Sequence, residues 1–100
     1  MLGRNDNYGH GRTIRGMAME SYNGWKNRAT WNVALWIENH ESLYRAAVEY
    51  ITKYPKSRHP YGNFIRSIGM QDERTPDGYK YISTRLCYRE LNEMMRELVS

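Results

Sequence analysis

The three tryptophans of this 100-residue chain all lie between residues 23 and 39. They are Trp25, Trp31 and Trp36, and no other stretch of the chain is so dense in large apolar side chains. Large aromatic side chains dominate what a chain of this length can bury. This block must therefore organise the core, form a binding surface, or do both.

The block predicts a helix over residues 28–39, with Asn27 as its N-cap and Thr30 as a second candidate for that role. At about 100° per residue, Trp31 shares a broad apolar face with the aliphatic residues of the segment. We therefore expect Trp31 in the core. We expect Trp25 to pack over the start of the helix, where the chain enters it.

The opposite side of this predicted helix carries Asn32 and Asn39, and Trp36 lies at the edge of that polar strip, about 40° from Asn32. Two interpretations remain open. Asn32, Trp36 and Asn39 can form one exposed strip that binds a partner, because tryptophan is enriched at interface hot spots. Alternatively, Asn32 faces water while Trp36 meets another helix or a second copy of the chain.

Three further helices follow from apolar periodicity and from helix breakers. Apolar residues recur at spacings of three and four over 43–54, and Pro55 ends that helix. Pro60 at a first helical position predicts a short helix that ends near Gly69. The last helix is expected to begin at residue 84 or 85 and to end at residue 98.

The connecting segments complete the predicted fold. Ser83 or Thr84 is expected to cap the last helix, and the sequence of residues 75–78 predicts a turn within a small hairpin near 70–82. Residues 1–22 are glycine-rich and polar without a period, which indicates a flexible tail. The expected fold is mainly α: a single compact domain of three to four helices over residues 23–100.

Patterns typical of catalysis or metal binding are scarce. Cys87 falls on the apolar stripe of the last helix, so we expect a small buried side chain and no nucleophile. Glu38, His40 and Glu41 cluster at a helix junction without metal-ligand spacing, so capping is the expected role and a metal or enzyme site the weaker alternative. We expect no catalytic residue, no metal and no cofactor.

Cysteine usage and hydropathy indicate the compartment. With one cysteine, the chain can form no internal disulfide, which suits a reducing intracellular setting. No stretch approaches the roughly 20 apolar residues of a membrane-spanning helix. The sequence therefore predicts a cytoplasmic protein without a membrane partner.

The centre of the chain is basic and rich in aromatic residues. The net charge is +4, and residues 50–71 contain no acidic residue. Basic side chains beside aromatic rings suit a phosphate backbone with stacked bases, and N–H groups at the helix start after Pro60 can add an anion site. By their spacing, Tyr54 and Phe64 are expected in the core. A solvated basic loop is the alternative to nucleic-acid or anion binding by Lys53, Lys56, Arg58, His59, Tyr61 and Arg66.

Residues 23–37 fit the pattern N-G-W-x-N-x-x-T-W-N-V-x-L-W-I, and in this they resemble small uncharacterised proteins of bacteriophages and other mobile elements. The resemblance extends over residues 23–54 and to the Leu/Met-rich segment 91–98. Positions 28 and 29 are Arg and Ala, where an aromatic and an acidic residue are expected.

The resemblance implies a phage setting and supplies no catalytic residues. By analogy, it favours a non-enzymatic accessory protein in the host bacterial cytoplasm that binds and modulates a host macromolecule. A host protein is the expected partner, and a defence or nucleic-acid-processing component is one kind of target. A small basic nucleic-acid-binding module is the alternative.

Overall fold

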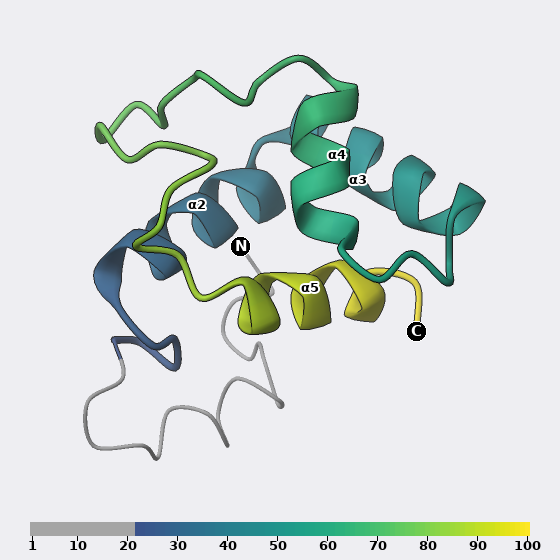
Figure 1. Cartoon of the computed structure of the whole chain (residues 1–100), viewed down its shortest axis with the longest axis horizontal. Coiled ribbons are helices and arrows are strands. Elements are labelled where there is room, and N and C mark those ends of the chain that lie inside the picture. Colours follow the sequence, from purple (N-terminus) through teal and green to yellow (C-terminus); the bar gives the residue numbers. More distant parts are fainter. Residues whose placement is uncertain (1–21) are drawn as a thin grey trace.

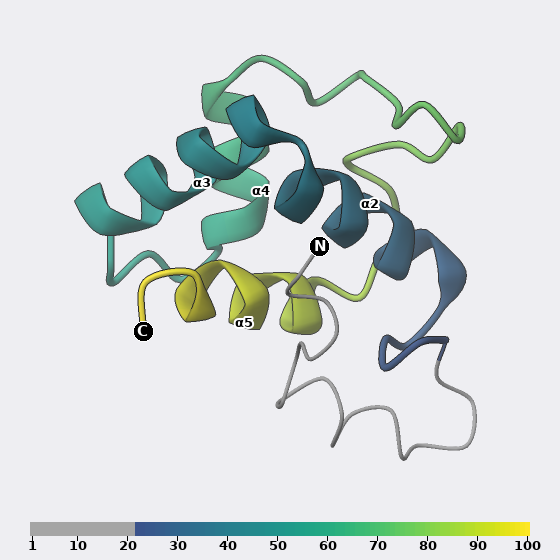
Figure 2. The same cartoon turned by 180° about the vertical axis from the view of Figure 1, so that it is seen from behind.

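The computed structural model describes residues 22–100, which form four α-helices and their connections, the longest of which precedes the last helix. The helices pack around one core, as Figures 1 and 2 show from opposite sides. This arrangement confirms the predicted mainly helical fold. The helices are α2 (Arg28–Asn39), α3 (Glu41–Lys53), α4 (Pro60–Ser67) and α5 (Tyr88–Glu97). The predicted tail lies outside the described residues, except for Tyr22.

Helix α2 has the predicted bounds, and its N-cap is Asn27, whose side-chain Oδ1 accepts a hydrogen bond from the Thr30 amide at 2.8 Å. The Thr30 hydroxyl donates to the same Oδ1 at 2.6 Å and accepts from the Cys87 amide at 3.0 Å. The Asn27 amide group donates to the carbonyl of Arg85 at 2.8 Å. The cap of α2 therefore also holds the segment that leads into α5.

Helix α5 is shorter than predicted, because it begins at Tyr88 rather than at residue 84 or 85. Ser83 and Thr84 therefore do not cap it. The N-cap is Cys87, which makes no side-chain capping bond. Cys87 therefore precedes the helix and is only partly buried, so its predicted place as a buried residue on the apolar stripe of the last helix was wrong. The Cys87 amide donates to Thr30 instead. This long-range bond joins the start of α5 to α2, directly after a turn in which the Leu86 amide donates to the carbonyl of Ser83.

The connection between α4 and α5 turns sharply at the predicted place. The Gly78 amide donates to the carbonyl of Thr75 at 2.8 Å, and an antiparallel bridge joins Arg74 to Lys80. The predicted hairpin is thus reduced to one bridge, and residues 22–100 contain no extended strand. Figures 1 and 2 show this connection arching from the end of α4 toward α2 before it returns to α5.

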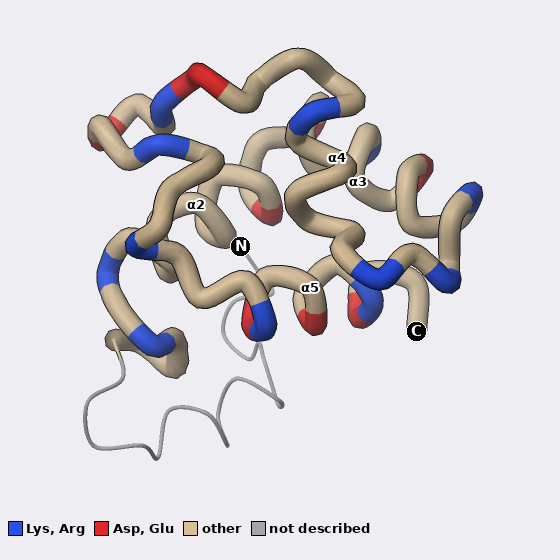
Figure 3. Tube along the Cα trace, in the orientation of Figure 1, with Lys and Arg blue, Asp and Glu red and all other residues tan. Residues whose placement is uncertain are grey.

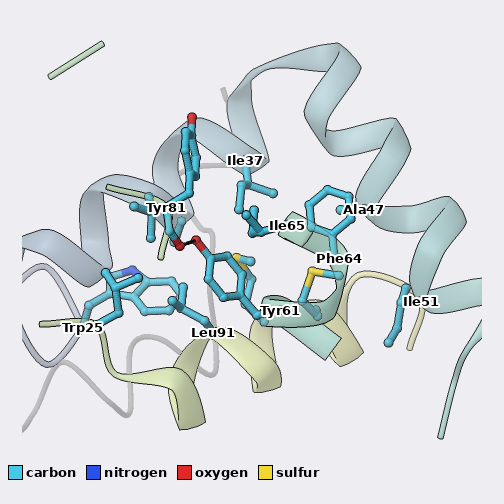
Figure 4. Close-up of a cluster of buried hydrophobic side chains, with 14 of the residues drawn as sticks. Trp25, Ile37, Ala47, Ile51, Tyr61, Phe64, Ile65, Tyr81 and Leu91 are labelled. Carbon is cyan, nitrogen blue, oxygen red and sulfur yellow. Dashed lines mark hydrogen bonds between the residues drawn. The ribbon is translucent and has the colours of Figure 1, made fainter. Parts of the chain in front are cut away.

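The core is built from the inner faces of all four helices together with Trp25, Tyr81 and Leu86 (Figure 4). Trp25 is only 3% exposed, whereas Trp31 is partly buried and stacks edge-on against Tyr22 at the margin, 5.1 Å between ring centroids. The tryptophan that lies outside the helix is therefore the one that anchors the core. The fully buried large side chains of the core include Val33, Ile37, Ile51, Tyr61, Phe64, Ile65, Leu91, Met94 and Met95.

A tight turn places Trp25 in the core. Asn23 and Gly24 both have positive φ angles, 50° and 88°, and Tyr22 and Trp25 exchange backbone hydrogen bonds across them. Asn-Gly is the preferred pair for a turn with two positive φ angles. This dipeptide is the sequence signal from which the turn could have been predicted.

Candidate functional site

The strip predicted on α2 is only partly exposed. Asn32 is only 2% exposed and donates through Nδ2 to Asp77 Oδ2 at 2.8 Å, and Trp36 Nε1 donates to the same oxygen at 3.0 Å. Asn39 is exposed, but its amide donates to the carbonyl of Leu35 in its own helix. The expectation that Asn32 faces outward was wrong, because the turn that carries Asp77 covers this side of α2.

Asp77 acts as a latch between this turn and α2. The hydrogen bonds from Asn32 and from Trp36 hold the pKa of the Asp77 carboxyl below its ordinary value against the opposing effect of burial, and the positive charge of Arg28 lowers it further. Asn32 Oδ1 is buried and accepts no hydrogen bond from the described residues. Asn32 Nδ2 and the indole N–H of Trp36 thus have a structural role, because both bind Asp77 and hold the turn against α2.

We expect the replacement Asp77→Ala to destabilise the fold at neutral pH and to matter less in acid. A carboxyl whose pKa is lower in the folded state stabilises the fold above its unfolded pKa of about 3.9, and this contribution is lost as the pH falls through the folded value. Denaturant unfolding of both proteins from pH 7 to pH 2 measures the difference. A gap that widens toward low pH would contradict the latch.

A shallow groove lies between α3 and α4. It consists of two hollows of about 500 Å³ and 490 Å³ that share four lining residues. We call it the α3–α4 groove and define it by these shared residues, Tyr50, Lys53, Tyr54 and Asn63. Ser67 and Ile68 line one end of the groove, and Lys56 and Ser57 line the other.

Tyr54 is the exposed aromatic ring of this groove. It is 46% exposed, so the expectation that it lies in the core was wrong. Helix α3 ends at Lys53, and Tyr54 is its C-cap with non-helical backbone angles, so the helical spacing no longer sets the direction of its side chain. Its ring lies 4.8 Å from that of Tyr50, which in turn lies 6.0 Å from the buried ring of Phe64.

A lysine accompanies this ring. The Lys53 Nζ lies 5.7 Å from the centroid of Tyr54, which is a cation–π distance. At an exposed site such a contact is worth about 0.5–1 kcal/mol. Lys53 can therefore leave the ring at small cost when a ligand offers a better partner.

The structure places the predicted basic residues in two groups. Lys53, Lys56, Arg58 and His59 are exposed at the end of α3 and in the loop before α4. Arg66 is also exposed, but it lies about 9 Å along α4 from the start of that helix.

Tyr61 was wrongly predicted as a contact residue. It is fully buried, and its hydroxyl donates to the carbonyl of Tyr81 at 2.6 Å (Figure 4). Burial raises the pKa of this hydroxyl well above its ordinary value, so it stays a donor. The predicted anion site at the start of α4 is also occupied, because the Tyr61 amide donates to Asn92 Oδ1 at 2.9 Å.

Arg96 of α5 joins the basic loop, although sequence reasoning did not select it. One guanidinium nitrogen of Arg96 lies 3.5 Å from the carbonyl oxygens of both Ser57 and Arg58. In Figure 3 the basic segments gather where the end of α3 and the loop before α4 approach the end of α5. Arg96 stands among acidic residues in the sequence, and no local pattern connects it with a loop some forty residues earlier.

Residues 18–100 of the chain match the model of a family of unknown function, DUF7249. The chain belongs to the DUF7249 family. No curated protein matches the chain, and no solved structure matches it. The match to DUF7249 includes every residue that the structure describes, and the family description gives no function.

The weaker metal-site alternative gains no support within the part of the DUF7249 domain that the structure describes. Residues 22–100 hold no group of three His, Cys, Asp or Glu side chains placed to bind a metal ion. Glu41 instead pairs with Arg45 one turn later, at 2.5 Å, on an exposed face of α3. In the same residues, no helix has both the length and the apolar character needed to span a bilayer.

Proposed function

We propose that the protein acts by binding rather than by catalysis, and that its α3–α4 groove binds nucleic acid. The observation that carries this proposal is the exposed ring of Tyr54 in a groove that Lys53 and Lys56 also line. Aromatic rings can stack on the bases of a nucleic acid, and lysines beside them can pair with its phosphates.

The charge around the groove supports this occupant. The basic segment carries Lys53, Lys56 and Arg58 without an intervening carboxylate, and Glu49 at the α3 side is the single acidic residue among those that line the two hollows. Lysines that neutralise phosphates release bound counterions, and this release supplies most of the sequence-independent affinity for nucleic acid.

The resemblance to phage and mobile-element proteins supplies the proposed setting. The protein would serve there as an accessory protein that binds a host macromolecule in the bacterial cytoplasm. In the strip first predicted to bind a host protein, Asn32 is buried and the Trp36 N–H donates a hydrogen bond to Asp77. The groove is therefore the better-supported contact surface, and a host protein becomes the alternative that the binding experiments test.

We expect the protein to bind a short fluorescent oligonucleotide with an affinity that falls steeply between about 50 and 200 mM salt. The double variant Lys53→Gln/Lys56→Gln should bind more weakly and lower the slope of log K against log salt by about 1.4, or about 0.7 for each lost phosphate contact with a single strand. Fluorescence anisotropy across the salt range measures both quantities.

Lys80→Gln is the matched control, because Lys80 is exposed and lies outside the groove. It should leave the slope nearly unchanged. A failure to bind at low salt, a flat salt response, or an equal effect of the control would each contradict nucleic-acid binding at this groove. Retention of one host protein by the purified protein, together with no oligonucleotide binding, would favour the host-protein alternative.

A further inference from the structure

We infer that the α3–α4 groove takes a single strand, with one base stacked on the ring of Tyr54. This inference rests on the proposed function and specifies its ligand class. A tyrosine ring binds a base through the flat face of that base, and in a duplex those faces are covered by neighbouring base pairs. An exposed ring in a groove is therefore useful to a protein that binds unpaired nucleotides.

The ring of Tyr54 packs against a second aromatic ring, which itself contacts the core. Tyr50 lies 4.8 Å from it, with a tilt of 44°, and itself rests 6.0 Å from Phe64 in the core. Tyr54 is nevertheless 46% exposed, although Phe64 is fully buried. This series of rings fixes an accessible aromatic surface before any ligand arrives, so little side-chain freedom is lost on binding.

Lys53 gives the site its phosphate contact. Its ammonium group lies 5.7 Å from the centroid of the Tyr54 ring in the free protein. A base that stacks on the ring can displace this weakly held ammonium, which then lies close to the phosphate of the same nucleotide. Lys56 follows the ring in the sequence and lines the adjoining hollow, where it can meet the next phosphate.

The opposite wall of the groove adds polar contacts and little selectivity. Asn63 of α4 lines both hollows, and its amide donates to Ser57 Oγ at 3.3 Å, a long and readily exchanged bond. One amide beside one ring can meet the edge of any base. We therefore expect binding that depends on strandedness more than on sequence.

The test compares one labelled single strand with the duplex of the same sequence, both at low salt. The single strand should bind more tightly, and Tyr54→Ala should weaken its binding at least about fivefold, which is the lower bound for the loss of a base–aromatic stack. Tyr54→Phe should keep the affinity, because it keeps the ring. Tyr44→Ala is the matched control, since Tyr44 is a 37% exposed tyrosine of α3 outside the groove.

The possible results separate this inference from the proposed function. Equal affinity for the duplex, or an unchanged single-strand affinity in Tyr54→Ala while Lys53→Gln/Lys56→Gln still weakens binding, would overturn the stacking inference alone. Failure of the wild-type protein to bind either nucleic acid would overturn both. Thermal unfolding of each variant checks whether an affinity loss comes from misfolding. We expect Tyr54→Ala to stay folded, because Tyr54 is exposed.

Discussion

Replacing Phe64 with alanine is expected to lower the free energy of unfolding by about 3–5 kcal/mol, which is a large part of the 5–15 kcal/mol typical of a domain. Phe64 is fully buried in the middle of α4 and supports the ring of Tyr50. The substitution removes apolar contacts and leaves a cavity that the surrounding helices can only partly close. Denaturant unfolding followed by circular dichroism measures the loss.

The same substitution connects the core with the site. Because Tyr50 lies between Phe64 and Tyr54, the cavity should loosen the ring series and weaken oligonucleotide binding even where the variant is still folded. Phe64→Leu is the control and should cost less, since it retains most of the apolar volume. A loss below about 1 kcal/mol in the alanine variant would show that α4 is not packed as described.

Trp25→Ala is expected to cost about 3–5 kcal/mol as well, and clearly more than Trp36→Ala. Trp25 is 3% exposed and packs in the core, whereas Trp36 is half-buried and is bonded to Asp77 through its indole N–H. Parallel denaturant titrations of the two variants measure the difference. Equal losses, or a greater loss in the Trp36 variant, would contradict the assignment of Trp25 as the anchor of the tryptophan block.

Local features of the fold were predictable from the sequence. The bounds of α2 and its cap Asn27 were predicted as they are found, and α4 begins at Pro60 as expected. In these cases one or two residues decide the result locally, Asn27 through its side-chain oxygen and Pro60 through its fixed backbone angle. The late start of α5 was not predictable in this way, because it depends on a hydrogen bond between Cys87 and Thr30, which lie far apart in the chain.

The candidate site was predictable only in part. The basic segment was recognised from its lack of carboxylates, but two of its tyrosines were assigned in reverse, with Tyr61 expected outside and Tyr54 inside. Tyr61 is buried because its hydroxyl finds a partner in Tyr81, and Tyr54 is exposed because it stands one residue beyond the end of α3. Both outcomes depend on tertiary contacts or on a helix end that periodicity does not locate to one residue.

Titration of the ¹⁵N-labelled protein with a short single-stranded oligonucleotide at low salt tests the nucleic-acid interface most directly. The proposal predicts that the largest amide shift changes occur at Tyr50, Lys53, Tyr54, Lys56 and Asn63, with the amides around Trp36 and Asn39 little affected. No shift changes at a large excess of oligonucleotide, or changes centred on Trp36 and Asn39, would contradict it.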